Sequence, residues 1–211
     1  MTSFPEGFLW GVSVSPFQFE MGDRLRRFID PNTDWWWWVR DPSNISKKLV
    51  SGDLPEDGIN YAELYKLDHS LAKDLGLNAY RLSIEWSRIF PCSTRHIEVD
   101  VERDGLGLIK DVRITKDVLE QLDEVANEDA VAFYRDIIKD LRMRGFKVIV
   151  NLSHFTIPIW LHNPIKARDT NLRRGPLGTV SEAFVVEFAK FAAYIAWKFG
   201  DLVDMWSTFN E

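Results

Sequence analysis

The sequence lacks the features that mark several unusual protein classes. It has one cysteine, Cys92, in 211 residues, which excludes a disulfide-stapled miniature. No basic cluster followed by an apolar run opens the chain, and charges such as Glu187 and Lys190 interrupt the long apolar stretches. We therefore expect no signal peptide, no membrane span and a cytoplasmic location. The 45% hydrophobic content excludes intrinsic disorder and allows a sizeable core.

Two classes of ligand also find no support. No basic stripe indicates nucleic acid, and no cluster of His, Cys or carboxylate residues has metal-ligand spacing. We expect no metal and no other cofactor. The net charge of -6 arises in residues 98–129, which hold eleven acidic and four basic residues. We interpret this segment as a solvated excursion rather than a binding surface.

Tryptophan, in contrast, is abundant: there are nine, and Trp35 to Trp38 are consecutive. Neither a helix nor a strand directs four adjacent side chains to one face. Some of these indoles must therefore face a cleft, a partner or solvent. Flat aromatic surfaces suit sugars, and a hydrophobic plug is the equally weighted alternative.

Four short stretches are typical of strands in a buried parallel sheet. Each is largely apolar on both faces and rich in β-branched or aromatic residues. They cover residues 8–14, 79–84, 147–152 and 203–209.

Three helices are predicted between these strands. They cover residues 61–75, residues 130–144, and a third segment that begins at a capping box in residues 179–182 and ends near Gly200. Their apolar stripes at helical spacing are Leu64, Leu67, Leu71 and Leu75; Val131, Tyr134, Ile138 and Leu141; and Phe184, Phe188, Phe191 and Ile195.

The connections between these elements are asymmetric. Each helix leads almost directly into the next strand, whereas the strand-to-helix loops are long, at about residues 15–60, 87–129 and 155–178. This asymmetry is typical of a (β/α)8 TIM barrel, whose active site is built from those loops. A doubly wound sheet is the main alternative, but no glycine-rich phosphate turn occurs. Residues 1–211 thus supply four strands and three helices, a single half of an eight-strand barrel.

The second predicted strand carries an arginine on the face that a barrel encloses. Strand alternation places Arg81, Ser83 and Glu85 on that one face. An enclosed guanidinium needs a carboxylate partner. A structural ion pair with Glu85 or another acid, and support of a catalytic carboxylate, remain equal alternatives.

The third and fourth strands end in residues that suit chemistry at the rim of a barrel. His154 follows the third strand beside aromatic residues, which favours substrate binding over a purely structural role. Asn210 and Glu211 end the fourth. A carboxyl group at the rim of an apolar cleft can keep a proton for a leaving group, and an amide can bind a sugar hydroxyl.

Together these motifs resemble glycoside hydrolase family 1. The resemblance covers the whole chain in order. Its motifs are Phe-Pro-Glu-Gly-Phe-Leu-Trp-Gly at residues 4–11 with Gln-Phe-Glu at 18–20, Tyr-Arg-Leu-Ser-Ile-Glu-Trp-Ser-Arg-Ile-Phe-Pro at 80–91, Ser-His-Phe at 153–155 with Pro-Ile-Trp-Leu at 158–161, and Ser-Thr-Phe-Asn-Glu at 207–211. Residues 34–36, 49–55 and the acidic segment resemble the archaeal β-glycosidases.

The resemblance implies a retaining β-glycosidase of carbohydrate metabolism that acts on β-glycosides or oligosaccharides. Glu211 is then the general acid/base, Arg81 supports the nucleophile and Asn210 binds the sugar 2-OH. Gln18 and His154 are implied to bind glycone hydroxyls.

Two aromatic residues complete the implied binding site. Phe155 occupies a glycone-side aromatic position, and Trp35 is the member of the tryptophan run that we expect nearest the site.

The chain departs from the family pattern in three ways. Thr156 stands where the family often has aspartate or proline, a change that we expect to affect local packing more than chemistry. Gly178 is followed by Thr179, where a tryptophan is common. No Thr-Glu-Asn-Gly motif supplies the nucleophile, although a retaining mechanism needs a second carboxyl group.

Two hypotheses follow. Either the chain carries the acid/base of an enzyme, is inactive alone and works with a complementary C-terminal half, or it is a non-catalytic half-barrel that self-associates into a homo-oligomer or binds such a partner.

Overall fold

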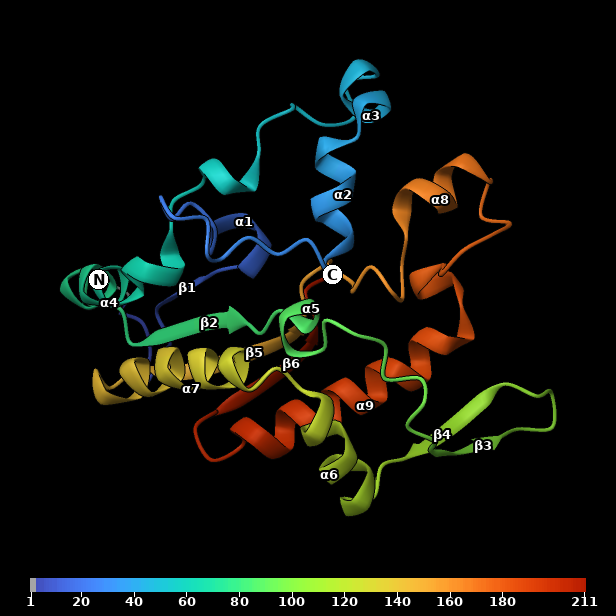
Figure 1. The fold of residues 1–211 in the computed structure, drawn as a ribbon. Helices are drawn as coiled ribbons and strands as arrows, with labels where there is room; N and C mark the ends of the chain where they lie inside the picture. The colour runs from blue at the N-terminus through green and yellow to red at the C-terminus, as the bar shows by residue number, and fades with distance from the viewer. Residues whose placement is uncertain (1–2) are drawn as a thin grey trace.

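A four-stranded parallel sheet organises residues 3–211, the part of the chain that the computed structural model describes (Figure 1). Its strands β1 (Gly11–Ser13), β2 (Ala79–Ser83), β5 (Lys147–Ser153) and β6 (Met205–Phe209) lie in chain order. A doubly wound sheet reverses its strand order at a switch point. These four strands contain no such reversal, so the structure supports the half-barrel and not the doubly wound alternative.

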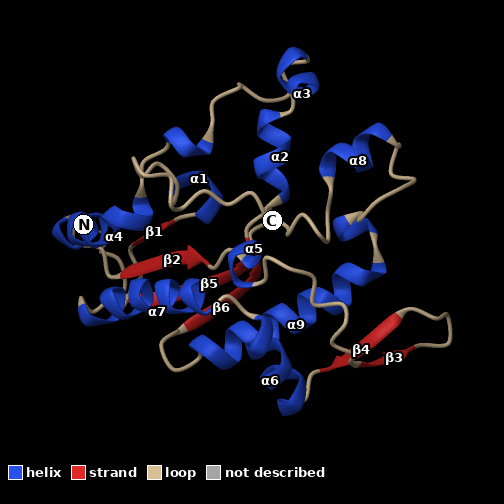
Figure 2. Cartoon of the chain, in the orientation of Figure 1, coloured by secondary structure: helices blue, strands red, loops and turns tan. Residues whose placement is uncertain are grey.

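The three predicted helices follow strands β1, β2 and β5 (Figure 2). They are α4 (Tyr61–Asp74), α7 (Glu128–Met143) and α9 (Glu182–Phe199). Gly76 and Gly145, just beyond α4 and α7, have φ angles of 79° and 80°. Only glycine adopts this left-handed conformation without strain, so both residues end their helices and turn the chain toward the next strand.

The predicted start of α9 is two residues too early, because the observed N-cap is Ser181 instead of Thr179. Gly178–Val180 forms a short 3-10 helix, η2, instead of the first turn of an α-helix. Ser181 is the N-cap, and its hydroxyl accepts a hydrogen bond from the backbone N–H of Ala183. The capping box at residues 179–182 is therefore absent, because a serine nearer the helix takes the capping role of Thr179.

The two faces of the sheet differ in polarity. The face toward the helices is apolar, and the opposite face carries polar side chains, because successive residues of a strand alternate between faces. The helix-facing residues include Tyr80, Leu82, Val148, Val150 and Leu152. The other face includes Arg81, Ser83, Asn151 and Ser153.

The two edge strands are exposed, contrary to the expectation of four buried strands. All three residues of β1 are exposed, and so are four of the five in β6. Only β2 and β5 have a paired strand on each side. The buried pattern of a closed barrel is therefore present at the middle of this sheet and missing at its edges.

The leucine stripe of α4 faces solvent rather than the core. Leu64, Leu67, Leu71 and Leu75 are 42%, 54%, 52% and 77% exposed. The buried residues of α4 are instead Tyr61, Ala62, His69 and Ala72. An amphipathic stripe normally faces the core, so helical spacing predicted the element correctly and its packing face incorrectly.

A buried histidine fixes α4 against α7. His69 is fully buried; its Nδ1 lies 2.7 Å from a carboxylate oxygen of Asp140, and its Nε2 lies 2.8 Å from the hydroxyl of Tyr61. Because the carboxylate only accepts, Nδ1 carries the proton and the Tyr61 hydroxyl donates to Nε2. Burial lowers the pKa of His69, and Asp140 opposes that effect.

The three long loops contain short elements that the sequence did not predict. They are α1 (Pro16–Phe19), α2 (Asp34–Arg40), α3 (Pro42–Ser46) and η1 (Pro55–Asp57) in the first loop; α5 (Trp86–Ile89), β3 (Asp100–Arg103), β4 (Ile109–Arg113) and α6 (Lys116–Val125) in the second; and α8 (Pro164–Asp169) and η2 in the third.

The acidic segment is only partly a solvated excursion. Its antiparallel hairpin β3–β4 projects from the body of the molecule (Figure 1), and most of its residues are exposed. Helix α6, in contrast, buries Val118 and Leu122 and packs against α9. Within α9, Glu187 and Lys190 form a buried ion pair of 2.9 Å. Among the helices described, none is long and apolar enough to cross a bilayer.

Candidate active site

Residues from three strands meet at the carboxyl edge of the sheet. Arg81 lies in β2, His154 follows β5, and Asn210 with Glu211 follows β6. In a parallel sheet the ends of neighbouring strands lie at one edge, so positions far apart in the chain become neighbours there. In Figure 1 the C-terminus lies near the middle of the view, below helices α2 and α8, which contact each other.

Arg81 joins three strands through one nitrogen. Its Nη1 donates to the hydroxyl of Ser13 at 2.8 Å and to the amide oxygen of Asn210 at 2.9 Å. The backbone N–H of Asn210 donates to the carbonyl of Ser153 at 3.0 Å. Asn210 is therefore held through both its backbone and its side chain.

The suggested ion pair between Arg81 and Glu85 is wrong. Strand β2 ends at Ser83, and Glu85 is the N-cap of α5, so the strand alternation does not extend to it. The carboxyl group of Glu85 is buried, and its oxygens lie within hydrogen-bond distance of the hydroxyls of Thr156 and Ser87. Arg81 instead bonds to the neutral groups of Ser13 and Asn210.

His154 occupies a partly buried position beside Arg81. Its Nδ1 lies 3.0 Å from the hydroxyl of Ser83. Burial lowers the pKa of His154, the positive charge of Arg81 lowers it further, and Glu211 raises it. The ring is therefore mainly neutral at pH 7, with one nitrogen able to donate and one able to accept. A neutral imidazole of this kind suits sugar hydroxyls.

Phe155 and Trp35 form an aromatic wall next to His154. Their rings stack with centroids 6.1 Å apart and planes 22° apart. Phe155 has a φ angle of 75°, a left-handed conformation that is strained for an aromatic residue. Such strain persists only where surrounding contacts fix the backbone.

The tryptophan run is helical, so its four indoles point in different directions. Trp35 contacts Phe17 and Phe155, and the indole N–H of Trp37 donates to a backbone carbonyl. Trp36 stacks on Arg40, and Trp38 lies near Arg168. Of the four, Trp35 is the one that these contacts place beside the candidate site.

Asp34 is a residue that the sequence analysis missed. One of its carboxylate oxygens accepts from the backbone N–H groups of Trp35 and Ile157, at 2.8 and 2.9 Å. The other lies 2.6 Å from Nδ1 of His162. Burial raises the pKa of Asp34, and these bonds oppose the rise. Asp34 thus ties the tryptophan helix to the loop after His154, a link that local sequence pattern does not reveal.

Gln18 and Glu211 are less tightly held than the other candidate residues. Gln18 is exposed on α1, next to Phe17, whose ring meets Trp35 edge-on at 5.8 Å. Glu211 is exposed and close enough to His154 to influence its pKa. The structure brings Arg81, His154, Phe155, Trp35 and Asn210 into one connected group, and the roles of all seven residues stay predictions.

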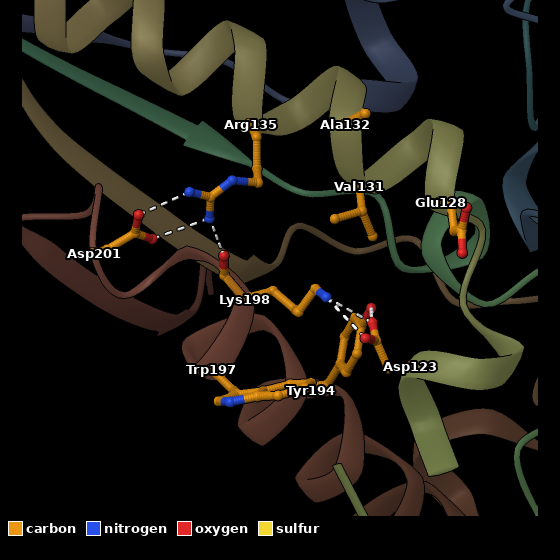
Figure 3. Close-up of a pocket in the computed structure, with 9 residues that line it drawn as sticks. All are labelled: Asp123, Glu128, Val131, Ala132, Arg135, Tyr194, Trp197, Lys198 and Asp201. Carbon is orange, nitrogen blue, oxygen red and sulfur yellow. Dashed lines mark hydrogen bonds and ion pairs between the residues drawn. The ribbon is translucent and has the colours of Figure 1, made fainter. Parts of the chain in front are cut away.

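One cavity lies beside the candidate residues, and another lies apart from them. One, of about 400 Å³, lies between α2 and α8 and is lined by Trp35, Trp38 and His162. The other, of about 590 Å³, lies between α6, α7 and α9 (Figure 3) and contains none of the candidate residues. Four of its charged side chains are paired, Arg135 with Asp201 and Lys198 with Asp123, and Glu128 also lines it.

No metal centre is evident in residues 3–211, where no three His, Cys, Asp or Glu side chains are grouped to hold an ion.

Comparison with known proteins gives a family match over nearly the whole chain. A family model described as Glycosyl hydrolase family 1 matches residues 1–108 and 121–211. The chain is 65% identical over 209 residues to a β-galactosidase of Pyrococcus woesei and 48% identical over 212 residues to one of Saccharolobus solfataricus. Both alignments cover at least 99% of this chain but only 41% and 42% of the relatives, so the chain spans less than half their length.

The fold comparison agrees. The β-glycosidase of the hyperthermophile Thermosphaera aggregans superposes on this chain with a TM-score of 0.97 at 51% identity. The match covers all of this chain and 43% of the T. aggregans chain. The observed sheet is therefore the N-terminal half of a (β/α)8 barrel, as the sequence predicted.

Proposed function

Because the chain belongs to glycosyl hydrolase family 1, we propose that it is the N-terminal part of a retaining β-glycosidase that cleaves terminal β-linked sugars, such as β-glucosides or β-galactosides. Glu211 is the general acid/base, and the substrate is a β-glycoside or oligosaccharide. The cytoplasm remains the proposed location.

The contact between Arg81 and Asn210 carries this proposal. Because the guanidinium occupies the amide oxygen of Asn210, the orientation of that amide is fixed and its NH2 group remains to donate to a ligand. A fixed amide donor beside the acid/base suits the sugar 2-OH, whose hydrogen bonds strengthen as the ring approaches the oxocarbenium-like transition state. Preorganised donors of this kind lower the barrier because they need no reorientation during reaction.

His154 and the aromatic wall suit the rest of the sugar. The neutral imidazole of His154 donates to or accepts from a hydroxyl, and the stacked rings of Phe155 and Trp35 offer an apolar surface for C–H groups. Gln18, exposed on α1, is free to reach a second hydroxyl. We assign these four residues to binding of the glycone.

The proposed reaction needs a second carboxyl group. A retaining mechanism places a nucleophilic carboxylate roughly 5–5.5 Å from the acid/base. The sequence motif of that nucleophile does not occur in these 211 residues. We therefore propose that a complementary C-terminal half supplies it, and that this chain alone is inactive.

The exposed surfaces of the chain favour such a complement. The unpaired edges of β1 and β6 can accept further strands. The groove beside β1, lined by Val12, Val14, Leu71, Leu75 and other residues, together with the leucine stripe of α4, suits an apolar helix. The alternative, self-association of two half-barrels into a homo-oligomer, uses the same surfaces.

Co-expression with a complementary half tests the proposal. The half is the C-terminal part of a family member that contains the nucleophile motif. Hydrolysis of 4-nitrophenyl β-glucoside or β-galactoside should appear only with both halves. Glu211→Gln should abolish hydrolysis of alkyl glycosides, whose leaving groups need a proton. With activated aryl glycosides it should spare release of the first equivalent of 4-nitrophenol and slow later turnover, because the general base is lost too. Equal activity of this variant on both substrates would exclude Glu211 as the acid, and a stable dimer of the chain alone in sedimentation would favour self-association.

A further inference from the structure

Thr156, which departs from the family pattern, has a buried partner in this structure. Its hydroxyl lies 2.8 and 3.0 Å from the two carboxyl oxygens of Glu85. Both side chains are buried, and they come from different loops, one after β2 and one after β5. Glu85 therefore reaches, from the neighbouring loop, the side chain at the position where the family often has aspartate or proline.

This contact is made by the residue that directly follows two candidate binding residues in the chain. Thr156 follows Phe155, whose φ angle of 75° requires external support, and His154 precedes both. The other anchor of the same turn is Asp34, which accepts from the backbone N–H of Ile157. Two buried carboxyl groups therefore hold this turn. Glu85 bonds to the side chain of Thr156, and Asp34 bonds to the backbone N–H of Ile157.

Glu85 is itself held rigidly. Its backbone N–H donates to the hydroxyl of Tyr134 at 3.1 Å, and Ser87 lies 3.1 Å from one of its carboxyl oxygens. The Ser87 hydroxyl also reaches Asp30, at 2.6 Å. Tyr134 of α7 therefore holds the backbone of Glu85, and Ser87 of α5, itself bonded to Asp30, holds its carboxyl group.

We propose that Glu85 is a positioning residue of the candidate site, which acts through Thr156 to hold the turn that presents His154 and Phe155 to the sugar. The proposal rests on the proposed function for its kinetic consequence. Its structural part, the dependence of His154 on Glu85, stands by itself.

The charges around Glu85 favour its neutral form. Three carboxyl groups, those of Glu20, Asp30 and Glu85, lie near one cation, Arg88, which pairs with Glu20 at 2.8 Å. Burial, with Asp30 and Glu20 next, raises the pKa of Glu85 to about 8. Tyr134 on α7 also faces this cluster and bonds to Glu20.

A neutral carboxyl group explains the hydrogen bonds around Glu85. One carboxyl oxygen, Oε2, is the carbonyl and accepts from Thr156 at 3.0 Å; the other, Oε1, carries the proton and donates to Ser87, which then donates to Asp30. An ionised carboxylate only accepts, so it leaves Ser87 with one proton for two anions. Glutamine mimics the neutral acid, since it offers one acceptor and one donor in nearly the same positions.

Histidine NMR on this chain tests the structural part. The ring signals of His154, assigned by their loss in His154→Gln, are followed from pH 6 to 10. In the wild type they should shift a second time near pH 8, as Glu85 ionises. Glu85→Gln should keep the wild-type signals and abolish that second shift, whereas Glu85→Ala and Thr156→Val should displace the signals at every pH.

Glu187→Gln is the matched control. Glu187 is also a buried glutamate that accepts from a threonine, Thr94, but it lies in α9. Its loss should leave the His154 signals unchanged. If Glu85→Ala leaves His154 unaltered, or if Glu85→Gln displaces it as much as Glu85→Ala does, Glu85 is not a positioning residue.

The kinetic part uses the co-expressed halves. Glu85→Ala should lower kcat/KM about a hundredfold, as expected when a binding group moves by about 1 Å. Glu85→Gln should recover most of that loss at pH 7, and Glu85→Ala with Thr156→Val should be no worse than Glu85→Ala. If the losses of Glu85→Ala and Thr156→Val add in the double variant, the two residues do not act through one contact. If the NMR result holds and no hydrolysis appears with any combination, the proposed function fails and the positioning contact remains.

Discussion

Arg81 in β2 and Asn210 after β6 are joined by a hydrogen bond of 2.9 Å although 129 residues separate them in the chain. Strand β5 lies between their two strands, so the contact reaches across the open face of the sheet. A second bond from the same guanidinium nitrogen reaches Ser13. One side chain thus ties the first strand to the last.

Replacing this arginine should therefore affect the site more than the fold. Arg81→Met should lower the free energy of unfolding by only about 1 kcal/mol, the typical net value of such hydrogen bonds. It should release the Asn210 amide and lower kcat/KM of the co-expressed halves at least tenfold. Arg103→Met, which removes an exposed arginine that pairs with Glu182, is the control and should leave kcat/KM unchanged. A Met variant at position 81 with normal kcat/KM would contradict the role assigned to this contact.

The tryptophan run allows a comparison between neighbouring residues. Trp35→Ala removes the ring stacked on Phe155 and should raise KM for an aryl β-glycoside about tenfold, a loss of about 1.4 kcal/mol. Trp37→Ala removes an exposed indole and should change KM less than twofold. Steady-state kinetics of the co-expressed halves measures both. Equal effects of the two variants on KM would show that substrate binding depends on the α2 helix as a whole and not on the Trp35 ring.

The α4 leucine stripe predicts a variant that separates folding from association. Leu71→Glu should change the free energy of unfolding of this chain by less than about 0.5 kcal/mol, because Leu71 is half exposed. The same variant should prevent co-expressed halves from associating, since it places a charge in an apolar interface. Leu141→Ala, at a fully buried position of α7, should instead cost about 2–5 kcal/mol. Urea unfolding and co-purification give the two readouts, and normal co-purification of Leu71→Glu would exclude the stripe as an interface.

The buried His69 predicts a stability change at acid pH. Burial lowers its pKa in the folded state, so below about pH 6.5 the unfolded chain binds a proton that the folded chain does not. The free energy of unfolding should therefore fall as pH decreases below 6.5. The lowered pKa of Asp140 adds a further loss at lower pH, because the unfolded chain takes up a proton at this carboxyl group before the folded chain does.

Substitution separates the histidine from the other groups. His69→Gln should destabilise the chain by about 1–3 kcal/mol and flatten the decrease just below pH 6.5. His96→Gln, at an exposed position, should leave that decrease as it is. An unchanged pH profile in His69→Gln would show that another group titrates in this range.

Local sequence pattern predicted the elements of the sheet but not how all of them pack. The apolar runs identified four strands, and Gly76 and Gly145 marked two helix ends, because these signals depend on neighbouring residues alone. The leucine stripe on α4 has the same helical spacing whether it packs on the core of this chain or faces outward. Its exposure was therefore not predictable from spacing.

The candidate site divides in the same way. His154 and Asn210 follow strands, and topology alone predicts that such residues meet at one edge. The supports of the site were not predictable. Asp34 and Glu85 act on residues 123 and 71 positions away, and neither carboxylate stands in a local motif that indicates its partner.

The unpaired edges of β1 and β6 also matter during synthesis. When translation continues beyond these residues, as in the longer relatives, the first half of the barrel leaves the ribosome before its partner strands exist. At about 5–20 residues per second the edges stay open for many seconds, long enough for two nascent chains on one message to pair with each other. Chaperone capture or slow initiation at neighbouring ribosomes would protect such a chain, and expression yield should fall as translation initiation is made more frequent.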